Sequence, residues 1–204
     1  MKSFLLAAFA GAAAVASAVM PISASAEPQT FRISTENNAN HVNTKLLEKF
    51  AESLQAKTEG KLKVELFHSG QLFKGRDVPK ALRQGSVEMA VVGTWQLGGI
   101  EPDINVFFVP SFYGLAGPDV HKLADGSVGK VVNEGLEDKL KVHVIGPWAD
   151  LGPAQLFTTE KAVKTHEDLA GLKLRIPGGA ANSARLKAIG AAPTVVPWPD
   201  TPLA

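Results

Sequence analysis

Apolar and polar residues alternate along short stretches of this chain, and these stretches are separated by others with helical spacing. The alternation predicts strands at 31–34 and 62–66. Between them lies a helix-like stripe, which we expect to face the core, with Thr44 as cap and Gly60 as end. The members of this stripe recur at helical spacing: Leu46, Leu47, Phe50, Ala51 and Leu54.

The pattern continues with a short helix and a third strand. We expect the helix at 77–84, stopped by Gly85, and the strand at 87–92, which is mostly apolar and so predicted to be buried on both faces. Strands that alternate with helices predict a parallel sheet with right-handed crossovers. Ligands of such sheets bind at the carboxyl ends of the strands. The loops that begin at Ser34, His68 and Gly93 are therefore the expected binding region.

The second half of the chain begins a new unit of the same type. We expect a helix over 119–140 with a break near Gly126, then a strand at 142–145. A further strand, helix and strand follow at 172–176, 180–189 and 194–196. These elements are too few to close a core of their own. The sequence thus predicts an α/β protein of two domains, truncated at its C-terminus, with domain I at 27–152 and the start of domain II at 153–204.

The N-terminus has the order of a secretory signal. Lys2 is followed by an apolar run from Phe4 to Val19, by Pro21, and by the small residues Ala24-Ser25-Ala26. A transmembrane anchor is the alternative, but the run is shorter than the roughly 20 residues that span a bilayer. We expect residues 1–26 to be a signal peptide cleaved after Ala26, which places the mature protein in the periplasm.

Composition narrows the possible partners. The chain has no cysteine, hence no lipid-anchor cysteine and no disulfide, and its 45% hydrophobic residues suffice for a core. Removing residues 1–26 removes only one of the 21 basic residues, which leaves 20 basic against 20 acidic. Without a basic patch, nucleic acid and anionic membrane surfaces are not expected partners.

No catalytic signature stands out. The stretch 126–130 has glycines and a lysine, but it lacks the spacing and the hydroxyl residue of a phosphate loop. The five histidines are scattered without metal-ligand spacing. We therefore expect no catalytic residues, no metal and no cofactor.

Two groups of motifs carry a resemblance to a known family. One is Ser69-Gly70-Gln71-Leu72 with the later stretch 82–89, and the other is 169–177 followed by 190–194. In this order, behind a signal, they resemble the solute-binding subunit of TRAP (tripartite ATP-independent periplasmic) transporters. The resemblance implies a monomeric clamshell protein that binds a small organic acid and works with the small and large membrane permease subunits.

The resemblance also implies that an arginine of domain II grips the ligand carboxylate, and the arginine in the motif is Arg175. A guanidinium matches a carboxylate with two parallel hydrogen bonds and stays charged at any relevant pH. Arg175 lies near the carboxyl end of a predicted strand, before Pro177-Gly178-Gly179 opens a helix whose N-terminus favours an anion. The alternative is a surface arginine at a strand edge.

Other candidates for the pocket have alternatives of their own. Gln155 falls where some relatives carry a second arginine, and otherwise it is an exposed loop residue. Trp198, Trp95 and Trp148 can wall a pocket, whereas buried tryptophans are more often part of a core. Asn38, in the polar run 36–41, can donate to a ligand or belong to a solvated loop with a helix cap.

The sequence therefore predicts a binding protein, not an enzyme, that captures a carboxylate and delivers it to a TRAP-type permease. Two alternatives stay open: a periplasmic enzyme acting on a small acid, and a ligand-sensing module of a membrane receptor. Four-carbon dicarboxylates, sugar acids, keto acids and aromatic acids all remain candidate ligands.

Overall fold

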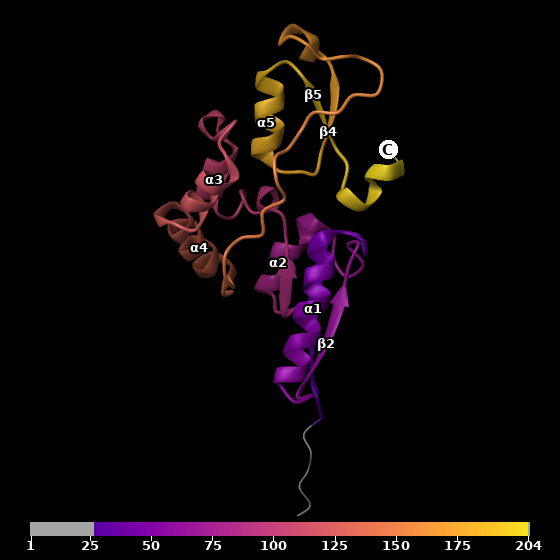
Figure 1. Ribbon diagram of the computed structural model, residues 1–204, viewed down its shortest axis with the longest axis vertical. Coiled ribbons are helices and arrows are strands. Elements are labelled where there is room, and N and C mark those ends of the chain that lie inside the picture. The colour runs from indigo at the N-terminus through magenta and orange to yellow at the C-terminus, as the bar shows by residue number, and fades with distance from the viewer. Residues whose placement is uncertain (1–26, 204) are drawn as a thin grey trace, which may run out of the picture.

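Two parallel β-sheets organise the chain. The computed structural model describes residues 27–203, so the expected signal peptide at 1–26 lies outside the described residues. The first sheet has the order β2-β1-β3 and the second pairs β4 with β5 (Figure 1). Their bounds are β1 (Gln29–Thr35), β2 (Leu62–Phe67), β3 (Met89–Val91), β4 (Lys173–Ile176) and β5 (Ala192–Val195).

The strand order of the first sheet reverses at β1. Helix α1 (Val42–Lys57) connects β1 to β2 on one side, while the 3₁₀ turn η1 (Gly75–Asp77) and α2 (Val78–Arg83) lead to β3 on the other. Ile33 of β1 is fully buried and is in register with Leu66 and with Met89. The predicted parallel α/β unit is thus confirmed. Its switch point lies beside β1, at the place where open α/β sheets form ligand crevices.

Three local predictions in this unit are wrong. Helix α1 begins at Val42 because the His41 ring, not Thr44, accepts a hydrogen bond from the Asn43 amide (3.1 Å). Leu46 and Phe50 are exposed at 57% and 36%, since the face toward the sheet runs through Asn43, Thr44 and Leu47 instead. Strand β3 is shorter than expected and only half-buried, because it lies at the edge of the sheet.

A helical layer follows the first sheet. The predicted helix over 119–140 is two helices, α3 (Gly117–Ala124) and α4 (Ser127–Leu140), and the break near Gly126 is confirmed. The 3₁₀ segments η2 (Thr94–Gln96), η3 (Pro102–Phe108) and η4 (Pro110–Phe112) precede these helices. Helix α4, η3 and the end of η2 form a hydrophobic core. The buried members of that core are Leu97, Ile104, Val132, Leu136 and Leu140.

The strand predicted at 142–145 is absent, and the expectation is wrong for a physical reason. Val142 and Val144 pack against the core of α4, and the Val144 amide donates to the Glu137 carboxylate at 2.8 Å. The alternating apolar residues of this segment therefore pack against a helix. The segment is extended but pairs with no strand among the described residues.

The second sheet carries the strand, helix and strand expected of the second unit. The 3₁₀ turn η5 (Glu167–Leu169) precedes β4, helix α5 (Ala180–Ala188) connects β4 to β5, and the 3₁₀ segment η6 (Trp198–Leu203) follows β5. Residues 149–160, where the boundary between 152 and 153 was predicted, form an exposed segment without helix or strand. None of the helices described within 27–203 is both long and apolar enough to cross a membrane.

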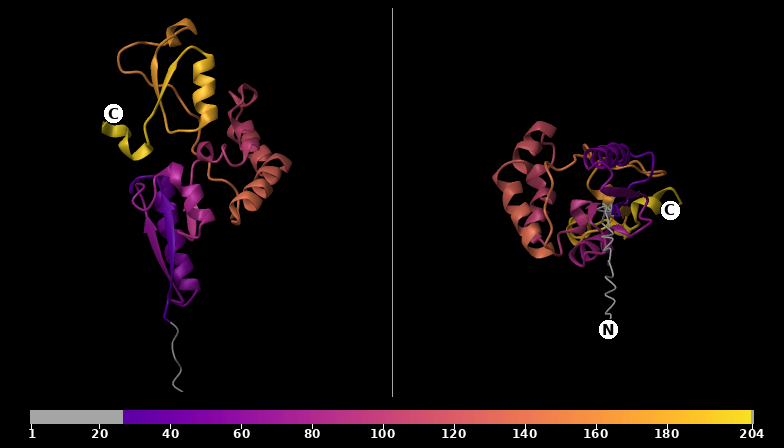
Figure 2. Two further views of the ribbon diagram at one scale, coloured as in Figure 1. Left: turned by 180° about the vertical axis from the view of Figure 1, so that it is seen from behind. Right: turned by 90° about the horizontal axis from the view of Figure 1, so that it is seen from below.

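The carboxyl ends of the two sheets meet at one junction (Figures 1 and 2). The Gln96 side chain, just after β3, lies 3.4 Å from the carbonyl oxygen of Pro177, the residue that follows β4. Segment η6, which follows β5, returns to the same junction, where Trp198 meets His41. The loops expected to bind ligand in the first unit therefore face the end of the strand that carries Arg175.

Candidate ligand-binding site

Arg175 lies at the junction with part of its guanidinium unpaired. It sits on β4 opposite Thr194 of β5, and its Nε donates to the Val196 carbonyl at 2.8 Å. Its Nη2 is buried and has no hydrogen-bond partner among residues 27–203. Burial lowers the pKa of Arg175, and the charge of Glu36 opposes this shift. A buried donor without a partner is costly, and a ligand carboxylate would satisfy it.

Trp198 covers the Arg175 guanidinium and connects it to the first unit. The guanidinium carbon lies 5.4 Å from the centroid of the indole. On another side the indole meets the His41 ring edge-to-face, with 6.4 Å between centroids. Trp198 is predicted from the sequence as an aromatic wall of the pocket, and in the structure it lies next to Arg175 with 39% of the residue exposed.

Trp95 contributes a donor at the same junction. Its backbone packs so closely on Gly179 that a Cβ at position 179 would lie 2.5 Å from the Trp95 carbonyl oxygen. Its indole nitrogen is buried and, within residues 27–203, has no hydrogen-bond partner. The backbone of Trp95 therefore lies against Gly179, four residues after Arg175, while its indole packs over Gly93.

Asn38 lines a hollow of about 340 Å³ beside Trp198. The other lining residues come from the loop after β2 and from η6: Ser69, Pro199, Thr201 and Pro202. The Asn38 side-chain oxygen accepts from the Asn40 amide at 3.1 Å, so it is engaged in its own turn. Its amide nitrogen is the part that can reach a ligand.

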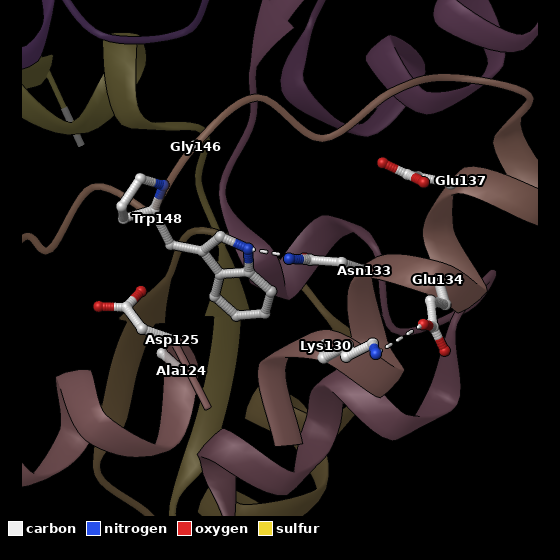
Figure 3. A pocket seen from close by; sticks show the side chains of 9 residues that line it. Ala124, Asp125, Lys130, Asn133, Glu134, Glu137, Gly146 and Trp148 are labelled. Atoms are coloured by element: carbon white, nitrogen blue, oxygen red, sulfur yellow. Dashed lines mark hydrogen bonds and ion pairs between the residues drawn. The ribbon is translucent and has the colours of Figure 1, made fainter. Parts of the chain in front are cut away.

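Trp148 occupies a different place. Its indole nitrogen donates to the Asn133 side chain at 2.9 Å, and its ring packs edge-to-face on Phe107 with 5.2 Å between centroids. Figure 3 shows it on the wall of a second hollow, about 480 Å³, to which α4 contributes Lys130, Asn133, Glu134 and Glu137. The structure does not bring Trp148 together with Arg175.

Gln155 is also outside the cluster around Arg175. It lies in the exposed segment that links the two units, with every residue of 149–160 exposed. This placement agrees with the alternative of an exposed loop residue, and it gives no support to a position next to the arginine.

Glu36 lies at this site although the sequence does not single it out. It directly follows β1 and is only 6% exposed, although it carries a carboxyl group. Burial raises the pKa of this carboxyl, and the smaller effect of the Arg175 charge lowers it. The sequence signal is the polar run 36–41 after a buried strand, which predicts either amide donors that line the cleft or a solvated loop with a helix cap, without singling out Glu36.

These groups suit recognition of an organic anion better than chemistry on it. The junction gathers a guanidinium, two indoles, a carboxyl and an amide on the carboxyl ends of two parallel sheets. Within residues 27–203 no group of three His, Asp or Glu side chains could hold a metal ion. The fold and the site together define an α/β ligand-binding protein.

The comparison with protein families identifies the kind of ligand-binding protein. Residues 33–201 match the model of the bacterial extracellular solute-binding proteins, family 7, and the chain belongs to that family. The resemblance to TRAP solute-binding subunits is thereby confirmed. Because the family is one of solute-binding proteins, it supports the expectation that the chain is not an enzyme.

Two curated relatives share 30% and 32% of their aligned residues with this chain. It is 30% identical over 166 residues to the 2,3-diketo-L-gulonate-binding periplasmic protein YiaO of Escherichia coli, which covers 81% of the chain and 49% of the relative. It is 32% identical over 146 residues to the C4-dicarboxylate-binding protein DctB of Bacillus subtilis, with 71% and 41% covered. The chain thus spans about half the length of the curated relatives it matches.

Solved structures confirm the expected fold class. The TRAP periplasmic solute-binding protein of Citrobacter koseri with bound D-glucuronate matches with a TM-score of 0.73 and 26% identity, over 84% of this chain and 57% of that one. A TRAP solute-binding protein of Sulfitobacter sp. NAS-14.1 with bound β-D-galacturonate has a TM-score of 0.77 at 24% identity, over 85% and 57%. The fold is that of two-domain α/β TRAP binding proteins.

Proposed function

We propose that this chain carries the acid-binding junction of a TRAP-type solute-binding protein, with Arg175 as the clamp of a ligand carboxylate. The observation that carries the proposal is the buried Nη2 of Arg175, which has no partner among residues 27–203. Its neighbour Nε is already held by Val196, so the guanidinium is oriented before a ligand arrives. Pre-orientation reduces the entropy that binding would otherwise cost.

The surrounding residues support a small organic acid. Trp198 offers an apolar face against the guanidinium, and Trp95 offers a buried N–H that lacks a partner within 27–203. Asn38 adds a polar group on the wall of the adjacent hollow. Relatives named above bind 2,3-diketo-L-gulonate and C4-dicarboxylates, and solved neighbours hold hexuronates, all of which are carboxylates. Gln155 and Trp148 are left out of this proposed site because of where they lie.

The proposal also covers the export, the location and the partners of the protein. Residues 1–26 direct export and are cleaved after Ala26, domain I ends at residue 152, and the mature protein acts in the periplasm as a monomer. It delivers its acid to the small and large subunits of a TRAP membrane permease. The family's extracellular assignment and the TRAP neighbours support this reading.

Calorimetric titration of the whole protein with D-glucuronate, D-galacturonate and succinate tests the proposal. Arg175→Ala should weaken binding about 10- to 100-fold, because a charge-assisted pair contributes roughly 1.5–3 kcal/mol. Arg175→Lys should fall between, since an ammonium keeps the charge and loses the planar fork. Arg83→Ala, which removes an exposed arginine of α2, is the matched control and should bind as the wild type does.

Two results would overturn the assignment: an Arg175→Ala protein that binds its acid with unchanged affinity, or a wild-type protein that binds no carboxylate of the panel. Recovery of the ligand after incubation separates binding from catalysis. A binding protein returns the acid intact, whereas the enzyme alternative requires a product.

A further inference from the structure

Arg185 of helix α5 reaches from the second unit to the first. Its Nη1 donates to the Tyr113 hydroxyl at 3.2 Å, and its guanidinium carbon lies 5.8 Å and 6.0 Å from the ring centroids of Phe108 and Tyr113. Phe108 ends η3 and Tyr113 follows η4, so both rings belong to the first unit. Views from the front and from behind show α5 on the same side of the second sheet as α3, with η6 on the opposite side (Figures 1 and 2). The contact is therefore separate from the hollow beside Trp198, which none of these three residues lines.

The segment that carries the two rings is fixed to the core of the first unit. Phe107 packs against that core and meets Phe112 and Trp148, with 5.4 Å and 5.2 Å between ring centroids. The Tyr113 hydroxyl donates to the Phe108 carbonyl at 3.3 Å, which leaves its oxygen to accept from the guanidinium. An arginine bound to these rings is therefore bound to a packed part of the first unit and not to a free loop.

The guanidinium of Arg185 is held by aromatic rings and not by a carboxylate. Among residues 27–203, none of the ion pairs with N–O distances up to 4.0 Å includes Arg185. Its Nε is buried and has no hydrogen-bond acceptor in the described part of the chain. A buried donor without an acceptor is costly, and such departures from optimal packing concentrate at functional positions. This makes a role beyond stability worth deriving from the position of the side chain.

Helix α5 meets the first unit at two places. At its start, a Cβ at position 179 would lie 2.5 Å from the Trp95 carbonyl oxygen, so the Gly179 backbone packs directly on that residue. Arg185 comes six residues later, which is about 9 Å along a helix that rises 1.5 Å per residue. One contact alone would leave the helix free to turn about it. Two contacts that are separated along its axis fix its direction on the first unit.

The direction of α5 determines where Arg175 lies. Only the turn Pro177-Gly178-Gly179 separates the end of β4 from the start of α5. The Asn182 side chain is only 3% exposed and donates to the Gly178 carbonyl at 3.0 Å, which ties the helix to this turn. A rotation of α5 on the first unit would therefore carry β4 and Arg175 with it.

From these contacts we infer that Arg185 is a positioning residue for ligand binding. By binding Phe108 and Tyr113 it holds the second unit at the angle at which Arg175 faces the binding loops of the first unit, and it touches no ligand itself. The inference rests on the proposed function, because it takes Arg175 as the carboxylate clamp. A protein that populates its binding arrangement only in part loses affinity by that fraction, whichever ligand it binds.

Calorimetric titration of the whole protein with D-glucuronate, D-galacturonate and succinate tests the inference. Arg185→Ala should weaken every acid that the wild type binds by about 3- to 10-fold, the range that loss of a partly exposed cation–π contact gives. The factor should be the same for each acid, so the ratios of the affinities keep their wild-type values. Lys187→Ala, at an exposed position of the same helix, is the matched control and should bind as the wild type does.

The aromatic side of the contact gives a second test. Tyr113→Ala should weaken binding as Arg185→Ala does, and Tyr113→Phe should weaken it less, because it keeps the ring and loses only the hydrogen bond. If the two residues act through one contact, the double variant Arg185→Ala/Tyr113→Ala binds no more weakly than the weaker single variant. Losses that multiply in the double variant would contradict the inference.

A distance between the two units separates positioning from a merely structural role. The chain has no cysteine, so Glu52→Cys on α1 and Lys173→Cys on β4, both at exposed positions, provide one pair of spin labels. Without ligand, Arg185→Ala should broaden or shift the distribution of distances between the labels, whereas Lys187→Ala should leave it unchanged. Saturating acid should return the Arg185→Ala distribution toward that of the wild type, because the ligand favours the binding arrangement.

The outcomes separate this inference from the proposed function. Unchanged affinity in a folded Arg185→Ala protein overturns the inference alone, as does a loss of affinity with an unchanged distance distribution. A loss that differs between the acids would make Arg185 a ligand contact and also overturns it. If Arg185→Ala does not fold, as judged by circular dichroism, Arg185→Lys and Tyr113→Phe decide the question by the same measurements. Unchanged affinity in Arg175→Ala, or a wild type that binds no acid, overturns the proposed function and the inference with it.

Discussion

The Arg175 guanidinium is held between a backbone carbonyl and an indole. Its Nε donates to Val196 at 2.8 Å, and its carbon lies 5.4 Å from the centroid of Trp198, two residues further along the chain. One edge and one face of the planar group are thereby occupied. The remaining edge, with the unpaired Nη2, is left for a ligand.

Trp198 should accordingly matter for affinity through its contact with Arg175. We expect Trp198→Ala to weaken acid binding about 5- to 30-fold, because a cation–π contact that is partly desolvated contributes roughly 1–2 kcal/mol. Trp198→Phe should retain much of the affinity, since it keeps an aromatic face. Titration calorimetry of the whole protein measures both, and equal affinity of wild type and Trp198→Ala would contradict the expectation.

The same contact gives an optical signal. Ligand binding next to Trp198 should change the intrinsic fluorescence, and the change should shrink in Trp198→Phe. In Trp148→Phe the change should persist, because Trp148 donates to Asn133 in the helical layer and lies apart from Arg175. A change carried mainly by Trp148 would move the site away from the junction.

Gly179 should be required for the close approach of the two units. Its φ of +88° is a conformation that side chains disfavour, and a Cβ there would lie 2.5 Å from the Trp95 carbonyl oxygen. Gly171 has a similar φ of +71° with nothing within 4 Å of a Cβ, so Gly171→Ala is the matched control for backbone strain alone. Gly171→Ala should cost about 1 kcal/mol of stability and leave ligand affinity unchanged.

Gly179→Ala should lose more stability than Gly171→Ala, because its Cβ also clashes with the Trp95 carbonyl, and should bind the acid at least 10-fold more weakly, because Trp95 is pushed away from the Arg175 strand. Chemical denaturation and calorimetry of both variants measure the two effects. Equal affinities in Gly171→Ala and Gly179→Ala would show that the contact with Trp95 does not shape the site.

The parallel sheets could be predicted from the sequence because their signals are local. Alternation at 31–34 and 62–66, and the glycine near the break between α3 and α4, depend only on neighbours along the chain. The strand predicted at 142–145 is wrong although its alternating pattern is also local. The conformation of this segment is set by Glu137, a residue of α4 whose carboxylate accepts a hydrogen bond from the Val144 amide.

Part of the site was predictable and part was not, for a related reason. Arg175 follows from a motif that keeps its spacing along the chain, and Trp198 follows from its place after the last predicted strand. Glu36 could not be singled out, because it is buried by packing next to Gly75 and Gln96, which the fold brings from two other segments. In the sequence, Trp148 and Trp95 both look like candidates for a pocket wall. Only tertiary packing shows that Trp148 lies in the helical layer and Trp95 at the junction.

Acid should weaken the first unit through Glu88. Arg32 donates to both carboxylate oxygens of Glu88, from Nε at 2.9 Å and Nη2 at 2.7 Å, and these bonds lower the pKa of Glu88 to about 2. Because this folded-state pKa lies below the ordinary value of 4.5, the contribution is complete above pH 4.5 and is lost as the pH falls toward 2.

At neutral pH, Glu88→Gln should cost about 1 kcal/mol, the upper end for a partly exposed pair. Below its folded pKa the wild type has lost the same interaction, so the two curves of unfolding free energy against pH should converge. Urea denaturation across this range measures them. Glu134→Gln, which removes an exposed partner 3.9 Å from Lys130, should change little. Parallel curves for wild type and Glu88→Gln would refute the expectation.

Arg185 should hold helix α5 to the segment that follows η3. Its Nη1 donates to the Tyr113 hydroxyl at 3.2 Å, and its guanidinium carbon lies 5.8 Å and 6.0 Å from the ring centroids of Phe108 and Tyr113. Arg185→Ala should lower the free energy of unfolding by roughly 1–2 kcal/mol and speed hydrogen exchange in both segments.

Arg185→Lys should be intermediate, because the ammonium keeps the charge and loses the planar stacking. Lys187→Ala, at an exposed position of the same helix, is the control. Exchange that stays as slow in Arg185→Ala as in the control would mean that apolar packing alone joins these two segments.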